Sequence, residues 1–264
     1  MCTYEKLQIR DSFMFGKVME DPENCEALLE ALLLEKIEVI DCPQREKFIQ
    51  MKKDGKYVQL DLHVKDSRSR IFDAEMQNKS KNPEKQAELP KRSRYYHSMV
   101  DCNETSAGTA YLDLSEVYVI FICTFDPFEK GLYKYTFQKT CIEDGEITLD
   151  DKATTIFFNA TAEYDDIPEK TRNLFRYIMK EEATDEITTR LKESVEEARM
   201  REDWGNEYMQ TVMHDTEVWN DGKAEGRAEG RVEGREEMRA ELQPEIDALK
   251  ALLLANNIPL PQTK

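Results

Sequence analysis

Alternating polar and apolar residues mark two neighbouring segments as β-strands. In residues 56–64, Lys-Tyr-Val-Gln-Leu-Asp-Leu-His-Val, Asp61 and His63 fall on one face and the leucines and Val64 on the other. Residues 71–77, Ile-Phe-Asp-Ala-Glu-Met-Gln, follow after a polar tip at 65–70. The pattern predicts a hairpin. A continuous apolar run at 117–124 predicts a buried central strand, and 132–139 and 155–159 are further strand candidates.

Apolar residues at helical spacing predict helices on both sides of these strands. One helix is expected over 11–34, broken at Asp21-Pro22, and another over 83–103, broken or kinked near Pro90. From Pro168 onward, Leu174 and Ile178 belong to the apolar face of a third helix. A fourth follows through Ile187, Leu191, Val195 and Ala198. Strands surrounded by helices indicate the α/β class.

The C-terminal segment contains a four-residue repeat, Gly-Arg-Ala-Glu in type, over residues 222–237. On a helix it would place like charges four residues apart, and each glycine costs about 1 kcal/mol relative to alanine. Alone, the repeat is expected to be frayed or disordered. Leu242, Ile246, Leu249 and Leu253 then follow at spacings of 4, 3 and 4, with Pro244 expected in the first turn. This seam predicts either a small element for oligomerisation or partner docking, such as a homo-oligomer through the C-terminal helix, or else an amphipathic helix folded back on the domain or a solvated tail.

Charge and cysteine content limit the environment and the partners. The net charge of −17 argues against nucleic acid, but residues 181–264 carry 21 acidic against 11 basic residues, whereas residues 65–94 carry nine basic against five acidic. The acidity is therefore concentrated in the tail. The six cysteines are scattered, and the first residues are charged where a signal peptide is apolar, which favours a reducing cytoplasm. No apolar run is long enough to cross a membrane.

The candidate chemistry lies on the hairpin. Asp61 and Glu75 are 14 residues apart, one on each arm, and Asp73, Glu75 and Gln77 share a face. Two carboxylates close together repel each other unless a cation lies between them. Mg²⁺, or Mn²⁺, prefers oxygen ligands and keeps several waters, so this pair and a phosphate would form a metal site. The alternative is two surface acids on the polar face of a ribbon.

These segments, in their order, resemble the PD-(D/E)XK nuclease superfamily, in the branch of recombination-promoting nucleases and PD-(D/E)XK family transposases. The resemblance rests on 11–18 (Asp-Ser-Phe-Met-Phe-Gly-Lys-Val), 58–62 (Val-Gln-Leu-Asp-Leu) and 73–77 (Asp-Ala-Glu-Met-Gln). It continues through Arg94-Tyr95-Tyr96, residues 119–128 and 133–137, the 168–178 helix and the Glu/Gly/Arg-rich tail, and so covers nearly the whole chain.

The resemblance implies residue roles. Asp61 and Glu75 would be metal ligands, and Gln77 stands where the superfamily usually has lysine; glutamine carries no charge but can orient a water molecule. Lys79 would supply the missing positive charge if the strand continued that far and placed it on the same face. Asp11 is either an accessory acid or a helix N-cap. Tyr95 and Tyr96 either contact phosphate or water or pack in the core. His63 is either a strand histidine or a ligand.

The resemblance also implies a fold and an activity. We expect a restriction-endonuclease-like core with a central mixed β-sheet flanked by helices, over residues 1–166, a helical extension over 167–220, and the repeat with its short coiled-coil-like helix over 221–264. The expected activity is metal-dependent endonucleolytic hydrolysis of DNA, with a link to recombination or mobile elements and with no other cofactor. The alternatives are a binding protein with a degenerate site and an RNA nuclease.

Overall fold

A five-stranded mixed sheet lies at the centre of the structure, which is a computed structural model describing residues 3–39, 47–49, 58–80, 82–105, 108–163 and 165–256. The strand order is β3-β4-β5-β7-β6; β4, β5 and β7 are parallel, and β3 and β6 are antiparallel edge strands. The bounds are β3 Leu62–Lys65, β4 Ile71–Gln77, β5 Val117–Cys123, β6 Lys134–Phe137 and β7 Ala153–Asn159. The expected mixed sheet and the β3–β4 hairpin are confirmed.

The predicted strand over 56–64 is divided at Asp61, a bend between β2 (Val58–Leu60) and β3. Strand β2 pairs with β1 (Lys47–Ile49) in a separate two-stranded antiparallel sheet. Lys56 and Tyr57 lie outside the described residues. At this bend the chain passes from the two-stranded sheet into the five-stranded sheet.

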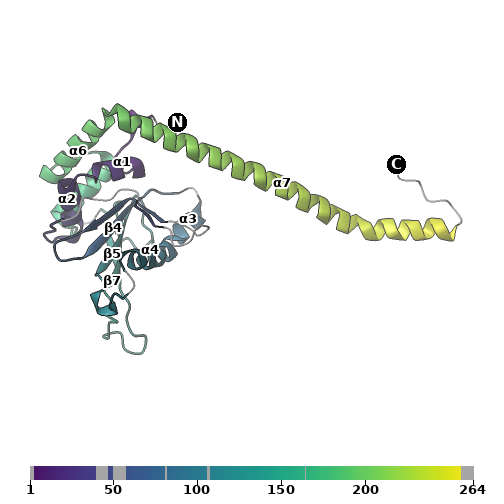
Figure 1. The fold of residues 1–264 in the computed structure, drawn as a ribbon, viewed down its shortest axis with the longest axis horizontal. Helices are drawn as coiled ribbons and strands as arrows, with labels where there is room; N and C mark the ends of the chain where they lie inside the picture. The colour runs from purple at the N-terminus through teal and green to yellow at the C-terminus, as the bar shows by residue number, and fades with distance from the viewer. Residues whose placement is uncertain are drawn as a thin grey trace. The chain divides into compact units, whose positions relative to one another are not determined.

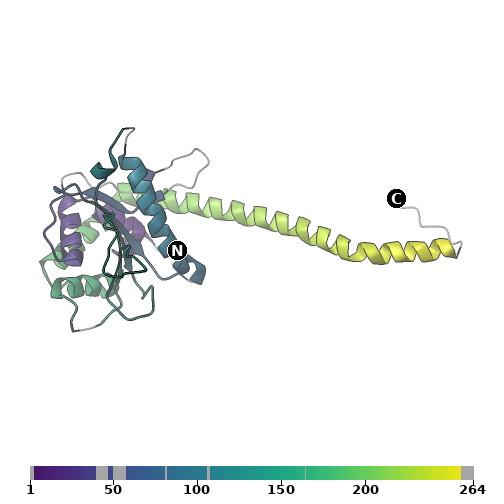
Figure 2. The same cartoon turned by 90° about the horizontal axis from the view of Figure 1, so that it is seen from below.

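Two layers of helices cover the sheet, as Figures 1 and 2 show, with α4 (Leu89–Glu104) on one side and α1 (Ser12–Val18), α2 (Pro22–Leu33) and α6 (Glu186–Arg199) on the other. The α4 side is a cluster of buried residues that includes Val119, Phe121 and Phe157. The opposite side takes the intervening residues, such as Phe158, whose ring packs on Phe175 of α5 (Glu169–Lys180) at 6.3 Å. Burying each such side chain contributes about 1.5–3 kcal/mol.

The expected helix breaks are present. Asp21 caps α2 by accepting a hydrogen bond from the Glu23 backbone N–H at 2.9 Å, and Pro22 occupies the first turn. The predicted 83–103 helix forms two pieces, α3 (Pro83–Ala87) and α4, which meet at Glu88. Short 3-10 helices lie at Tyr4–Lys6 and Tyr111–Asp113.

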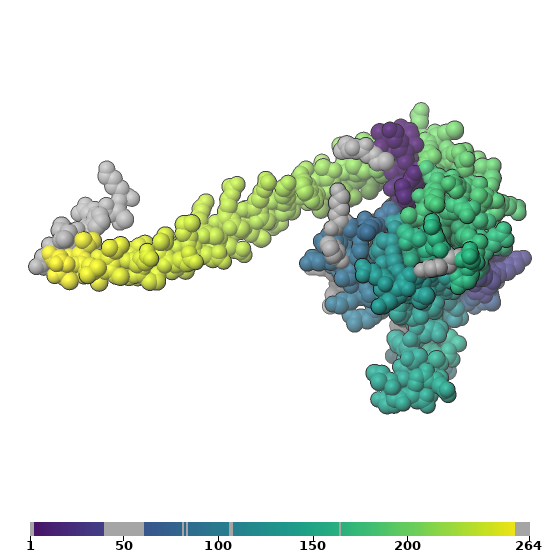
Figure 3. All heavy atoms as spheres, turned by 180° about the vertical axis from the view of Figure 1, so that it is seen from behind, coloured from purple at the N-terminus to yellow at the C-terminus, as the bar shows by residue number. Residues whose placement is uncertain are grey.

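The chain divides into two compact units, Met1–Gly205 and Asn206–Lys264, and α5 and α6 both belong to the first. The reason is packing: α5 and α6 contact α2, and the Thr171 hydroxyl donates to the Ala31 carbonyl at 2.6 Å. These two helices therefore complete the layer over the sheet. Figure 3 shows in teal a projection from this unit that includes the β6–β7 loop, where the Ile142 side chain is 97% exposed.

The repeat lies within α7 (Glu202–Ala255), a continuous helix that contains no buried residue. The expected fraying is therefore not seen, although the cost of the glycines remains. Pro244 lies inside this helix rather than in a first turn. Proline removes one backbone hydrogen bond and bends a helix, and Figure 2 shows α7 changing direction in its C-terminal part. Among the described residues, no helix combines the length and apolar character needed to cross a bilayer.

Candidate metal centre

The hairpin register brings Asp61 and Glu75 together. Leu62 pairs with Ala74 at the start of β3, so Asp61, the residue before it, lies next to Glu75. The Asp61 backbone N–H donates to Glu75 Oε1 at 3.2 Å, and the Met76 N–H donates to Asp61 Oδ2 at 3.2 Å. The two carboxyl groups therefore meet where the chain bends into β3, as the spacing of the two acids predicts.

The surroundings of Glu75 disfavour the ionised form of its carboxyl group. The residue is 2% exposed, and burial followed by the charges of Asp61 and Asp73 raises its pKa well above the usual range. Asp73, two residues earlier on the same face of β4, is fully buried. Arg92 acts in the opposite direction, as does the hydrogen bond from the Asp61 backbone. Three acidic groups thus converge on one face of the sheet.

Arg92 provides a positively charged side chain next to Glu75. Its Nη2 atom lies 3.1 Å from Glu75 Oε2 and donates to the Tyr96 hydroxyl at 2.7 Å, while Nη1 donates to Gln77 Oε1 at 3.2 Å. Its guanidinium also lies over the rings of Tyr96 and Phe121, at 5.3 and 5.8 Å from their centroids. Arg92 is a residue of the site that the sequence patterns did not predict. The available signal was its position four residues before Tyr96 in a predicted helix, which places both on one face.

Gln77 is half-buried at the last position of β4. Its amide nitrogen donates to Glu75 Oε2 at 3.4 Å, and its amide oxygen accepts from Arg92. The positive charge beside Glu75 is therefore supplied by the helix α4 and not by the strand residue.

Tyr96 both packs in the core and faces the site. It is 6% exposed, its ring lies 6.1 Å from that of Phe121, and its hydroxyl contacts Arg92. Burial, and then the charge of Glu75, raise the pKa of Tyr96, so the phenol stays protonated at neutral pH. Tyr95 is half-buried against the same cluster.

The other candidate residues lie around this centre. The Asp11 carboxylate accepts from the Gln8 backbone N–H at 2.7 Å, and the adjacent Arg10 carbonyl accepts from the Asn78 side chain, so this turn lies beside the end of β4. Strand β4 ends at Gln77, so the strand-face argument for Lys79 does not apply; Lys79 is exposed in the segment that follows. His63 is buried, and its Nε2 lies 3.8 Å from Glu104 Oε1.

The donor set fits a divalent cation bound with water and substrate oxygens. Among the described residues, no group of three or more His, Cys, Asp or Glu side chains is arranged to hold a metal by itself. Asp61 and Glu75 do provide two carboxylates whose repulsion raises the Glu75 pKa. A hard cation would relieve that repulsion, and Mg²⁺ commonly binds through one or two carboxylates and completes its shell with water and phosphate.

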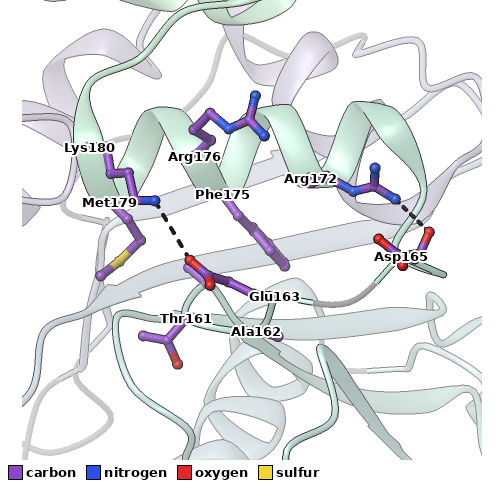
Figure 4. A pocket seen from close by; sticks show the side chains of 10 residues that line it. Thr161, Ala162, Glu163, Asp165, Arg172, Phe175, Arg176, Met179 and Lys180 are labelled. Atoms are coloured by element: carbon purple, nitrogen blue, oxygen red, sulfur yellow. Dashed lines mark hydrogen bonds and ion pairs between the residues drawn. The ribbon is translucent and has the colours of Figure 1, made fainter.

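Two pockets lie on opposite faces of the sheet. One, of about 490 Å³, adjoins the carboxylate pair, and Gln77, Asn78, Lys85 and Arg92 are among its lining residues. Figure 4 shows another, of about 510 Å³, between α5 and the segment after β7. There, Lys180 pairs with Glu163 at 3.6 Å, and Arg172 donates to backbone carbonyls, so these cations serve local structure.

A family model described as PD-(D/E)XK nuclease family transposase matches residues 12–227. Searches of curated proteins and of solved structures found no match. The matched range includes the hairpin, Asp61, Glu75, Gln77 and Arg92, and extends into α7.

Proposed function

The chain belongs to the PD-(D/E)XK nuclease family transposases, and from this premise we propose that it is a divalent-metal-dependent DNA endonuclease. The observation that supports the proposal most directly is the meeting of Asp61 and Glu75 on the hairpin, with the pKa of Glu75 raised by burial and by its acidic neighbours. Such a pair is suited to binding a cation.

Each residue of the centre has a role in this proposal. Asp61 and Glu75 hold Mg²⁺ or Mn²⁺, which when bound lowers the pKa of a water molecule and neutralises charge on the phosphate. Gln77 orients the attacking water through its amide group. Arg92 supplies a second positive charge toward the phosphate, and the Tyr96 hydroxyl positions the guanidinium.

Plasmid cleavage tests this function. We expect nicking and linearisation with Mg²⁺ or Mn²⁺, inhibition by EDTA, and a loss of at least about 100-fold in Asp61→Ala and Glu75→Ala, since removal of one group that stabilises developing charge typically costs about that much. Glu197→Ala is a matched control, because this exposed acid lies on α6, on the other face of the sheet. Cleavage by wild type that is no greater than in both mutants, on single- and double-stranded DNA, would exclude the proposal.

A second candidate is a binding protein with a degenerate site, favoured by the uncharged Gln77 at the position of the usual lysine. Mn²⁺ titration calorimetry separates the two. A degenerate site predicts no difference between wild type and Asp61→Ala, whereas a functional site predicts binding that this substitution abolishes.

We also propose that the C-terminal part of α7 joins two copies of the chain. Leu242, Ile246 and Leu249 of the predicted seam are 41–59% exposed. In a parallel pair, Glu245 of one copy would face Lys250 of the other, which favours association in register. Light scattering should show a dimer for wild type and a monomer for Leu249→Asp; equal masses would contradict the proposal.

Free thiols support a cytoplasmic location, which we propose as well. Among the described residues, Cys25, Cys102, Cys123 and Cys141 form no disulfide. A reducing compartment keeps cysteines in this state.

A further inference from the structure

The segment next to the carboxylate pair is basic although the chain as a whole is acidic. Residues 79–94 contain six basic and two acidic residues in a protein of net charge −17. Lys81 lies outside the described residues. The other five basic residues lie between the end of β4 and the second turn of α4. The local charge near the candidate site is thus opposite to that of the molecule.

Several of these cations form no ion pair with another described residue. Lys85, Lys91 and Arg94 are exposed, and among the described residues no acid forms an ion pair with them. Arginines elsewhere are neutralised locally: Arg70 lies 2.8 Å from Asp66 Oδ2, and Arg199 lies 2.8 Å from Glu181 Oε1. Cations without partners keep their charge available for an external anion.

The pocket of about 490 Å³ connects Lys85, one of these cations, with the site. Gln77, which contacts Glu75, lines one part of it, and Lys85 and Arg92 line another. Its remaining walls combine polar groups with apolar surface: Asn78, Ser80, Gln86, Glu88, Leu89 and Phe125. Amides and hydroxyls can hydrogen-bond base edges, and apolar walls accept a base that has left its stack.

The periodicity of α4 extends the basic surface away from the pocket. Arg92 and Tyr96, four residues apart, face the carboxylates, whereas Lys91 and Arg94, three residues apart, share an exposed face. Figure 1 shows α3 and α4 together beside the β4 region of the sheet. A DNA strand that leaves the site along α4 would pass these positive charges one after another.

We propose that the pocket is a subsite for one unpaired nucleotide of the DNA strand, adjoining the bond to be cleaved. Lys85 neutralises the phosphate of that nucleotide, and the following phosphates lie against Lys91 and Arg94. The volume suits one nucleotide better than a base pair with both of its backbones, so the substrate of this proposal is single-stranded or frayed at this position. The inference rests on the proposed nuclease function, whose substrate it makes specific.

Binding without cleavage tests the subsite. Full-length Asp61→Asn protein in EDTA is titrated with a fluorescent single-stranded oligodeoxynucleotide at several salt concentrations, and the anisotropy gives the affinity. Each phosphate contact contributes about 0.7 to the slope of log affinity against log salt for a single strand. Lys85→Gln/Lys91→Gln/Arg94→Gln should therefore lower the slope by about 2. Lys6→Gln/Lys170→Gln, which replaces exposed lysines on other elements, should leave the slope unchanged.

The outcomes separate this inference from the function on which it rests. An equal change of slope in the triple variant and the control overturns the subsite. A duplex that binds more tightly than the single strand of the same sequence overturns the unpaired nucleotide, and a tenfold preference for RNA overturns the assignment to DNA. Failure of the nuclease function would instead appear as no metal-dependent cleavage by wild type, with the slope difference retained.

Cleavage kinetics give an independent readout. In protein with Asp61 restored, the three glutamine substitutions should raise KM for single-stranded DNA about tenfold or more and leave kcat within about twofold. The reason is that they remove binding that is equal in the ground state and the transition state. Unchanged KM in protein that still cleaves overturns the subsite and leaves the nuclease function standing. Circular dichroism confirms that the variant is folded, which its exposed substitution sites favour.

Discussion

At the level of single residues, the carboxyl group of Glu75 is placed where its charged form is disfavoured. It is buried beside Asp61 and Asp73, and Arg92 offsets only part of their effect. A group whose pKa is higher in the folded than in the unfolded protein binds more protons when folded. Its contribution to stability therefore falls as pH rises from the unfolded value toward the folded value.

Glu75→Gln should consequently stabilise the protein in the absence of metal. The gain is expected to be small near pH 4.5 and to grow as pH rises to neutrality, because the variant has no charge to bury. Urea unfolding at pH 5 and pH 8 in EDTA measures it. If the free energy of unfolding depended on pH in the same way in wild type and variant, burial of the Glu75 charge would not be destabilising.

His97 has the opposite pH dependence. Its imidazole is half-buried against β7, where Nε2 lies 3.0 Å from Thr155 Oγ1, and this partial burial, assisted by Lys139, lowers the His97 pKa to about 4. The stability that depends on neutral His97 is present above pH 6.5 and is lost as pH falls toward 4. The difference in pKa corresponds to about 2 kcal/mol between pH 7 and pH 5.

His97→Gln should remove most of that acid sensitivity. The free energy of unfolding from urea titrations at pH 7 and pH 5 should differ by about 2 kcal/mol less than in wild type. His214→Gln is the matched control, since this histidine is exposed in α7. An equal change in the control would assign the pH dependence to other groups.

The residues of the site were predictable to different degrees. The closeness of Asp61 and Glu75 was predictable from the hairpin. Side chains alternate between faces with a period of two, and a separation of 14 residues places both acids on the same face. Arg92 comes from a helix packed on that face, and the orientation of α4 depends on core residues such as Phe121 rather than on local sequence. Long-range contacts of this kind have no signature in one sequence.

At the level of elements, strong periodicity predicted strands and helices well, and the breaks at Pro22 and Pro90 followed from backbone chemistry. The bend at Asp61 was missed because the polar–apolar alternation continues through it. The continuous α7 also differs from expectation, since propensity alone disfavours a helix with a glycine at every fourth position.

The glycines of the α7 repeat offer a direct test of that propensity. An added Cβ at Gly222, Gly226, Gly230 or Gly234 would meet no atom within 4 Å. Replacing all four with alanine should therefore stabilise the helix by about 1 kcal/mol per site and make the ellipticity at 222 nm more negative. Reduced helicity, or a lost dimer, would reveal that this face is used for packing.

Gly108→Ala should instead lower the free energy of unfolding of the protein, because the backbone φ angle of Gly108 is +96°.

At the level of the whole molecule, the two compact units should unfold separately. The Met1–Gly205 unit has a buried core, whereas α7 has no buried residue and contains nearly half of the residues in the described α-helices. A helix without tertiary burial melts gradually. On heating, we expect nearly half of the helical signal to be lost in a broad phase before the cooperative transition of the core.

Tryptophan fluorescence separates the two phases. Trp204 is half-buried, with its ring 4.2 Å from the Arg201 guanidinium, and Trp219 is 61% exposed in α7. In Trp219→Phe protein, the remaining fluorescence follows the core while circular dichroism follows both units. Coincident transitions in the two signals would show that the tail unfolds together with the core.

The four-residue period of the α7 repeat also has a consequence for how its length can vary. Adding or deleting one Gly-Arg-Ala-Glu unit keeps every residue type in its own row along the helix. It moves the Leu242 seam by about 6 Å along the axis and turns it by about 40°. The repeat is thus a spacer whose reach can change in small steps, by gain or loss of whole units, without a new surface chemistry at any step.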